Sequence, residues 1–314
     1  MPLLSRRMLL RAATETTYGT APTLSASNAV MVRVRPDFQP MVADAIEREQ
    51  LRPFFGGFTQ ELVNKYVAIT FQVELAGSGA AGTPPRYGPI LKACAHSETF
   101  DLPNLATSVT YAPATTNLSS CTIDFNIDGN NHRMTGCRGS MNIVGEVRSF
   151  PYIEFTIWGL YNAPTATALP AATYGAQADA RPFADTFTTF SVASHTNCLA
   201  SFNLQQGNEM NYDELISCTN SINIIDRRAS GNFTIEAPSI STKDFFAAAL
   251  ATSTVTGQLV QNVGAIGNIV TINIPQLDLG APAYAERNGK EMLSLPFTAP
   301  PSSAGSDEYS IVYT

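Results

Sequence analysis

Alternating apolar and polar positions recur along most of the chain and predict a protein built mainly of β-strands. In residues 269–274, Val270, Ile272 and Ile274 lie on one face of a strand, opposite two polar residues. Comparable runs predict strands at residues 30–35, 66–75, 107–112, 121–127, 140–147, 152–160, 187–192, 199–204, 221–225, 232–237, 268–274, 292–297 and 309–313. Asp128-Gly129 predicts a tight hairpin turn, because type I′ turns require positive φ.

Two short helices are predicted between these strands. The apolar run 245–250 follows Ser241-Thr-Lys-Asp244, which resembles a capping box with Asp in place of the usual Glu. Residues 89–95 form the other helix, with Pro89 near its first turn, where a missing amide hydrogen costs nothing.

The order of these elements repeats about 150 residues apart. Each helix follows a strand that ends in Glu plus a small or apolar residue, at Glu74 and at Glu236, and each half closes on an aromatic strand. This repetition predicts a duplicated β-sandwich or barrel-like domain with one helix per repeat. The expected boundaries are an N-terminal arm at 1–22, a first domain at 23–162, a linker at 163–186 and a second domain at 187–314.

Charge is sparse and unevenly placed. Charged residues make up 14% of the 314 positions, against about 25% in typical soluble proteins, and the net charge is −7. Residues 1–165 hold 13 basic and 13 acidic side chains, whereas residues 166–314 hold 6 and 13. Tight binding to nucleic acid depends on clustered Lys and Arg, so this composition argues against it. Sparse charge also suggests that part of the surface is covered by other copies of the chain.

The sequence contains few features that indicate a cellular compartment. No apolar run approaches the length of about 18 residues needed for a membrane helix, and the first ten residues do not resemble a signal peptide. We therefore expect no membrane insertion. The five cysteines show no CxxC spacing, and their odd number predicts reduced thiols in a protein made in the cytosol.

Three motifs imitate chemical sites. Gly77-Ser-Gly79-Ala-Ala-Gly82 is a literal GxGxxG, but Thr83-Pro-Pro separates it from the helix that a dinucleotide site requires. Residues 124–135 begin like a calcium loop but end on Thr135 instead of Glu, which favours a hairpin. The three histidines are scattered and are expected at the surface or in loops. We predict no enzyme activity, catalytic residue, metal ligand or cofactor.

Several segments resemble the major tail tube proteins of long-tailed bacteriophages. The segment Ala12-Ala-Thr-Glu-Thr-Thr-Tyr-Gly-Thr-Ala-Pro22 is similar to their N-terminal arm, and Tyr87-Gly-Pro-Ile-Leu-Lys-Ala-Cys94 to their helix. Ile225–Pro238, Lys243–Phe246, Gly289–Phe297 and Asp307–Val312 resemble further segments of the second half and the closing hairpin. Many relatives have a single tube domain and form six-fold rings, whereas this chain is expected to carry two.

The resemblance implies a structural virion protein that forms stacked rings through which DNA is ejected. Six tube domains per ring would come from three chains, giving a pseudo-six-fold trimer. The implied partners are further copies of the chain, tail terminator, tape measure and distal tail proteins, and genomic DNA that passes without tight binding. The implied locations are the virion tail and, before assembly, the host cytoplasm.

The long segment after the opening strand of each half is the candidate contact between rings, at 37–58 and 205–216. Both are expected to be loops, and long loops are commonly functional. The first mixes apolar and charged residues, as interfaces with a charged rim do. The candidate residues are Phe38, Met41, Val42, Asp44, Glu47, Arg48, Glu49, Arg52, Phe54, Phe55, Gln205, Glu209, Tyr212 and Asp213. Deleting 37–58 is expected to leave folded chains that cannot stack.

One alternative function remains open from the residues alone. A carbohydrate-binding or carbohydrate-cleaving β protein of a virion or cell surface would have a similar strand-rich sequence. Pairs of carboxylates from distant segments can assemble such a site, and a sequence does not reveal them.

Overall fold

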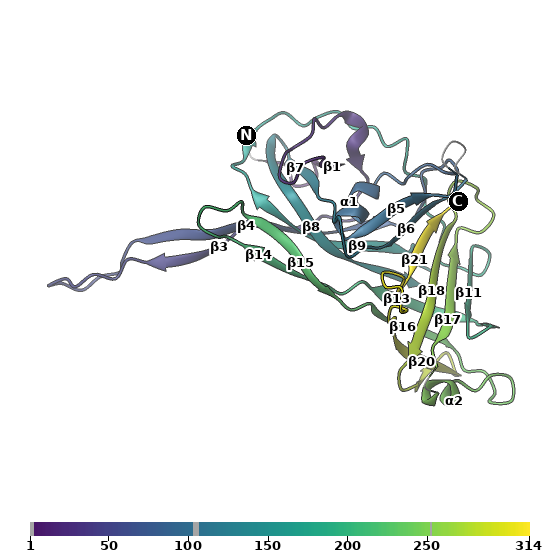
Figure 1. Ribbon diagram of the computed structural model, residues 1–314. Coiled ribbons are helices and arrows are strands. Elements are labelled where there is room, and N and C mark those ends of the chain that lie inside the picture. The colour runs from purple at the N-terminus through teal and green to yellow at the C-terminus, as the bar shows by residue number, and fades with distance from the viewer. Residues whose placement is uncertain (1–2, 103–106, 252) are drawn as a thin grey trace.

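The computed structural model describes residues 3–102, 107–251 and 253–314, and it consists mainly of antiparallel strands (Figure 1). The first half contains β1 (Met8–Thr14), a 3₁₀ turn (Ala26–Asn28), β2 (Ala29–Val30), β3 (Asp37–Glu47), β4 (Gln60–Glu74), α1 (Gly88–Ala93), β5 (His96–Phe100), β6 (Val109–Pro113), β7 (Cys121–Ile127), β8 (Asn130–Glu146), β9 (Tyr152–Tyr161) and β10 (Thr165–Ala166). The second contains β11 (Thr188–Val192), β12 (His195–Thr196), β13 (Leu199–Gln205), β14 (Asn208–Asp213), β15 (Ser221–Arg227), β16 (Ser230–Glu236), α2 (Phe245–Leu250), β17 (Val255–Gln261), β18 (Val270–Leu279), β19 (Ala283–Arg287), β20 (Lys290–Thr298) and β21 (Ser310–Tyr313).

The largest sheet, here called sheet A, runs through both halves. In the first half its strands follow the order β3–β4–β9–β8, and β7, β1 and β2 continue it from one end of β8. The other end of β8 pairs with β13, so that β13–β16–β20 of the second half extend the same sheet. The predicted β-rich fold is thereby confirmed.

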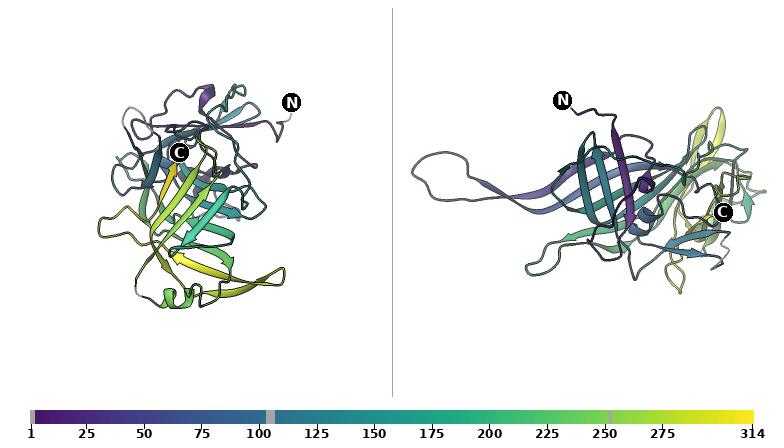
Figure 2. Two further views of the ribbon diagram at one scale, coloured as in Figure 1. Left: turned by 90° about the vertical axis from the view of Figure 1, so that its right-hand side faces the viewer. Right: turned by 90° about the horizontal axis from the view of Figure 1, so that it is seen from above.

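A second sheet, sheet B, also joins the halves. Its order is β12–β11–β17–β18–β21–β6–β5, and the pair β21–β6 connects the end of the chain to the first half. The two sheets enclose one continuous apolar core in which Phe71, Phe155, Phe202 and Phe233 are buried. Figure 2 shows how the sheets enclose the interior from two further directions.

Both predicted helices are present. Helix α1 carries Pro89 in its first turn, as its sequence indicates. Helix α2 begins after Asp244, whose carboxylate accepts a hydrogen bond of 2.8 Å from the amide of Ala247. The cap of α2 is therefore Asp244 and not Ser241, because a cap must lie directly before the first helical residue.

The two halves repeat one local arrangement around these helices. The amide of Leu75 donates to Pro151 in the first half, and the amide of Ala237 donates to Glu291 in the second. Thus β4 corresponds to β16, β9 to β20 and β3 to β13. The edge of the second half equivalent to β8 is formed by the end of β18 and by β19, which both pair with β20.

Three expectations differ from the structure. The predicted loops 37–58 and 205–216 are largely paired strands, because β3 pairs with β4 and β14 pairs with β15. The predicted strand 30–35 is reduced to β2 at its start. Within the expected arm 1–22, β1 pairs with β7 along its whole length. The domain boundaries proposed from the sequence stay a prediction.

Candidate assembly surfaces

A long hairpin formed by β3 and β4 projects far beyond the body of the molecule (Figure 1). The strands stay paired from Asp37↔Thr70 out to Glu47↔Gln60. The connecting residues 48–59, here called the tip, carry fully exposed Leu51 and Phe55. Exposed aromatic and aliphatic side chains on a projection of this kind mark an interaction surface.

Charged residues of this hairpin that the sequence analysis named form side-chain contacts between β3 and β4. Asn64 donates to Asp44 at 2.8 Å and Gln60 to Glu47 at 2.7 Å across the two strands. Arg48 pairs with Glu61, and the guanidinium of Arg52 lies 4.8 Å from the ring centroid of Phe58. All of these groups are near solvent, so each contributes little stability but helps to keep the strands in register.

The predicted residues divide between exposed and buried positions. Glu49, Phe54 and Phe55 are exposed on the tip, as is Met41 on β3. Phe38 instead packs into the core, with its ring 5.0 Å from that of Phe125. Phe38 therefore fixes the base of the hairpin rather than presenting a contact.

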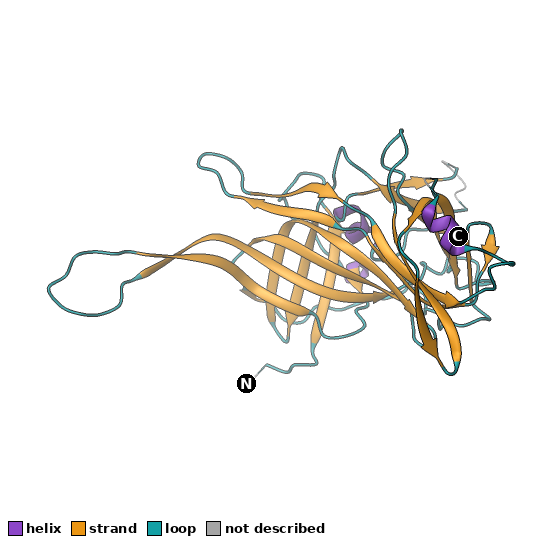
Figure 3. Cartoon of the chain, turned by 90° about the horizontal axis from the view of Figure 1, so that it is seen from below, coloured by secondary structure: helices purple, strands orange, loops and turns teal. Residues whose placement is uncertain are grey.

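The second hairpin, β14–β15, projects toward the same side as the first (Figure 3). Glu209 is exposed on it, and Gln205 is exposed at the end of β13 just before it. The ring of Tyr212 lies 5.4 Å from that of Tyr66 on β4 in a tilted arrangement, and Asp213 accepts a hydrogen bond of 2.7 Å from Asn223. The structure thus brings the two predicted segments close together, with Tyr212 against the base of the longer hairpin.

Residues outside the candidate contact set anchor this second hairpin. Arg138 on β8 donates to the carbonyl of Ile222 at 2.9 Å and lies over the ring of Tyr18. The hydroxyl of Tyr18 accepts from the amide of Ile222 at 2.7 Å. Trp158 packs against Tyr66 beside them, with ring centroids 4.9 Å apart. No spacing in the sequence connects these positions, because they come from five separate segments.

The carboxylate of Glu15 fastens the N-terminal segment to sheet A. It accepts hydrogen bonds from the amides of Gly19 and Gly136, both at 2.8 Å. The hydroxyls of Ser120 and Thr122 donate to it at 2.6 and 2.7 Å. The side chain is buried, so these four donors replace the water that a carboxylate otherwise needs.

Several strands have one unpaired edge among the described residues, and two of them, β3 and β19, lie at edges of sheet A. Strand β3 pairs with β4, and strand β19 pairs with β20; each has its other edge free. Exposed edges carry free amide and carbonyl groups that can pair with another chain. At the equivalent place inside the chain, β8 and β13 pair from Ser201↔Glu146 to Gln205↔Asn142.

The solvent-facing side of sheet A is polar and poor in charge. Hydroxyl and amide side chains alternate outward from β4, β9, β8, β13, β16 and β20: Thr70, Gln72, Thr156, Ser140, Asn142, Ser201, Asn203, Asn232, Thr234 and Ser294. Neighbouring strands are linked there by Gln72 to Glu154 at 2.9 Å and by Asn232 to Ser294 at 3.1 Å.

The glycines of the GxGxxG motif serve close packing between the halves. The amide of Gly77 donates to Asn268 at 2.7 Å and that of Gly79 to Gly267 at 3.0 Å. A Cβ at Gly77 would lie 2.3 Å from the carbonyl oxygen of Gly267. The position therefore requires glycine because two backbones meet there.

The calcium-like segment forms the predicted hairpin. Its turn, Asp128-Gly129, has positive φ at both residues. Buried Asp124 is held by Arg133 at 2.8 Å and by Arg11 at 3.0 Å, so its charge is already compensated.

Two polar residues are buried away from solvent. His96 is buried, contrary to the expected surface position, and Arg227 is largely buried in an ion pair with Glu308 at 2.7 Å. Arg227 therefore forms its ion pair inside the chain, where it links β15 to Glu308 just before β21. Exposed Arg228 pairs with Asp226 at 3.2 Å.

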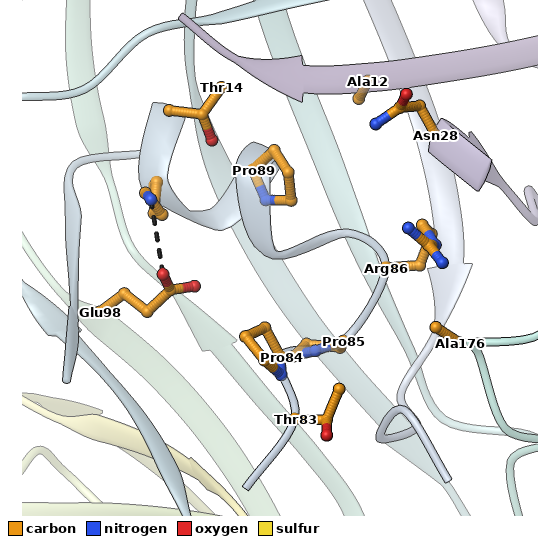
Figure 4. Close-up of a pocket in the computed structure, with 11 residues that line it drawn as sticks. Ala12, Thr14, Asn28, Thr83, Pro84, Pro85, Arg86, Pro89, Glu98 and Ala176 are labelled. Carbon is orange, nitrogen blue, oxygen red and sulfur yellow. Dashed lines mark hydrogen bonds and ion pairs between the residues drawn. The ribbon is translucent and has the colours of Figure 1, made fainter. Parts of the chain in front are cut away.

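A pocket of about 320 Å³ lies between β1, α1 and residues 83–86 (Figure 4). Glu98 is the only carboxylate among the residues that line it, and it is engaged by Lys92 at 3.4 Å and by the hydroxyl of Tyr111 at 2.6 Å. Glycoside cleavage commonly uses two carboxylates, so this pocket does not favour the carbohydrate-cleaving alternative. Within residues 3–102, 107–251 and 253–314, no group of three or more His, Cys, Asp and Glu could hold a metal ion.

A family model described as phage tail tube protein matches residues 5–299. The chain belongs to this family. It is a structural protein of the phage tail, as the resemblance implied. A search of curated proteins found no match.

None of the helices in the described segments combines the length and the apolar character needed to cross a membrane.

Proposed function

We propose that three copies of the chain form a ring, that rings stack into a tube, and that DNA passes through the tube at ejection. The joint between β8 and β13 carries this proposal, because it already connects two equivalent half-sheets edge to edge within one chain. Repeating that joint between chains would place six half-sheets around a ring of three. The family match supports the tail tube assignment itself.

Ring closure would use the free edges of β3 and β19. Strand β3 corresponds to β13, and β19 corresponds to the end of β8, so β3 of one copy would pair with β19 of the next. This pairing would cover the free edges of β3 and β19, which limits edge-to-edge aggregation through these two strands.

The polar face of sheet A would line the channel. Hydroxyls and amides offer no fixed cationic site, and the nearby Glu154 and the net charge of −7 weakly repel phosphate. A channel lined in this way lets DNA slide, because affinity for a duplex comes mainly from Lys and Arg.

Stacking would use the tip of the β3–β4 hairpin, with the β14–β15 hairpin as its neighbour. Both project to the same side, so both would reach the adjacent ring (Figure 3). Leu51, Phe54 and Phe55 would supply the apolar centre of that contact and Glu49 part of its charged rim.

The remaining contacts follow from this role. Tail terminator, tape measure and distal tail proteins would meet the ends or the lumen of the tube, and assembly would occur in the host cytoplasm. The chain would act without catalysis or a cofactor.

Negative-stain electron microscopy of the concentrated protein tests the proposal. We expect hollow rings or tubes whose end-on averages have three-fold symmetry with six similar lobes. Compact monomers at every concentration, even with a tail-initiation complex added, would contradict it. Rings of true six-fold symmetry built from six chains would contradict the trimer alone.

A further inference from the structure

The two helices end in the same way but differ sharply in exposure. The amides of Cys94 after α1 and Ala251 after α2 each donate to residues three and four positions earlier. In α1, Ile90, Leu91 and Ala93 are buried, whereas in α2 Leu250 is 86% exposed. Equivalent helices in a duplicated fold are therefore covered in one half and open in the other.

The strands beside the helices show the same asymmetry. Ile143 on β8 and Tyr284 on β19 are equivalent, because each lies opposite the corresponding region of β9 or β20 next to the hairpin turn. Ile143 is buried, but Tyr284 is 61% exposed and rests against the ring of Phe246. Ile240, Leu250 and Tyr284 are exposed, and half-buried Phe246 lies beside Tyr284. These four apolar side chains are here called the α2 face.

The second half supplies the cover over α1. Both Gln206 and Asn208, at the junction of β13 and β14, donate their side-chain amides to the carbonyl of Cys94, the latter at 3.2 Å. This contact is possible because β13 pairs with β8 and brings the junction over the end of the helix.

The equivalent segment of the first half is residues 40–43. Asp37 on β3 corresponds to Asn203 on β13, since Asp37 pairs with Thr70 and Asn203 with Asn232. Continuing along both strands matches Gln206–Asn208 with residues 40–43, where the register of β3 shifts between Gln39 and Val42. This bulge presents apolar Pro40 and Met41 to solvent instead of amides.

We propose that the bulge at residues 40–43 of a second copy packs on the α2 face, in the place that Gln206 and Asn208 take on α1. The chemistry is complementary, because an apolar bulge meets an apolar surface, whereas a polar junction meets a helix carbonyl inside the chain. The proposal rests on the ring assembly proposed above and names the residues of its side contact.

Chemical cross-linking tests this contact. The variant carries Met41→Cys and Leu250→Cys in a background in which the exposed Cys198 and Cys218 are replaced by Ser. The three other cysteines are buried and inert toward a maleimide. A short bis-maleimide should produce covalent dimers and trimers on denaturing gels. A matched control combines Met41→Cys with Ile266→Cys, which is also exposed but lies away from α2, and should remain monomeric.

Microscopy and cross-linking together distinguish failure of the α2-face contact from failure of the ring assembly. If microscopy shows rings but the 41/250 pair yields no more cross-linked product than the control, the α2 contact is overturned and the ring stands. If the unmodified protein forms no rings, both proposals fail.

A charge variant provides an independent check. Leu250→Asp should leave thermal unfolding unchanged, because the side chain is exposed, but should raise the concentration needed for ring formation by at least about tenfold. Adding Met41→Lys to the same chain should restore part of the loss. Unchanged assembly of Leu250→Asp would contradict the contact.

Discussion

His96 and Tyr309 meet between the two halves, with Nε2 of His96 2.8 Å from the hydroxyl of Tyr309. The other ring nitrogen, Nδ1, lies 2.8 Å from the carbonyl of Leu91, so it donates and Nε2 accepts. Burial lowers the pKa of His96 to about 4, and the nearby Arg227 guanidinium acts in the same direction. The neutral imidazole is thus part of the joint between α1 and the end of the chain.

Stability should fall as the pH drops from about 6.5 to 4. The unfolded chain binds a proton at His96 near pH 6.5 and the folded chain only near pH 4, so stability is full above 6.5 and is lost as pH falls. A gap of this size corresponds to about 3 kcal/mol at most. Urea unfolding at several pH values measures the slope.

The His96→Gln variant should show a shallower slope over this range, because the buried site no longer takes up a proton on unfolding. His195→Gln, in the short strand β12, is the matched control and should keep the original slope. Equal slopes for His96→Gln and the unmodified protein would exclude His96 as the titrating group.

Gly77→Ala should destabilise the protein by about 1–3 kcal/mol or more, because overpacking against a backbone carbonyl cannot be relieved by rotating a side chain. The new Cβ would lie 2.3 Å from the oxygen of Gly267 in the other half. Gly57→Ala, where an added Cβ meets nothing within 4 Å, is the control and should change stability little. Equal unfolding midpoints for the two variants would contradict this prediction, because they would show that the segments around Gly77 and Gly267 move apart at little cost.

Glu15→Gln should cost about 2 kcal/mol or more of unfolding free energy, because hydrogen bonds to a buried charge are the strong ones and an amide cannot accept from all four donors. The surface substitution Glu49→Gln should be close to neutral. Calorimetry of both variants compares them directly. A neutral effect at Glu15 would mean that water replaces the lost contacts.

Alternation predicted the strands whose two faces differ. Residues 121–127 and 152–160 emerged almost unchanged as β7 and β9. β9 packs one face on the core, whereas β7 is buried on both faces, with Ile123 and Phe125 on its apolar face and Thr122, Asp124 and Asn126 on its polar one. The β3 strand was missed because its outer part is exposed on both faces, so its side chains do not alternate, and Pro40 interrupts it. Backbone pairing with β4 decides the structure there, and a single segment does not reveal its partner.

Contacts between distant segments could not be predicted from the sequence, because they too depend on which strands pair. Tyr18, Arg138 and Ile222 meet only because β13 pairs with β8 and carries the second hairpin over the first half. The exposed tip residues could be proposed earlier, since an apolar and charged mixture within one segment needs no partner to be noticed. Phe38 looked similar in sequence but turned inward, because the alternation of β3 at its base places it toward Phe125.

Replacing the tip, residues 48–59, with an Asn-Gly turn should abolish stacking while leaving rings intact. The deletion of 37–58 first suggested by the sequence would also remove β3, whose pairing with β4 belongs to sheet A, so the shorter replacement is the informative one. Asn-Gly suits a two-residue hairpin turn, so the shortened strands should keep their register. Electron microscopy should show isolated rings in place of tubes, and thermal unfolding should be almost unchanged because Leu51 and Phe55 contact no core residue. A matched variant that shortens the turn 214–220 between β14 and β15 shows whether the second hairpin shares the role. Long tubes from the variant without the tip would refute stacking through this segment.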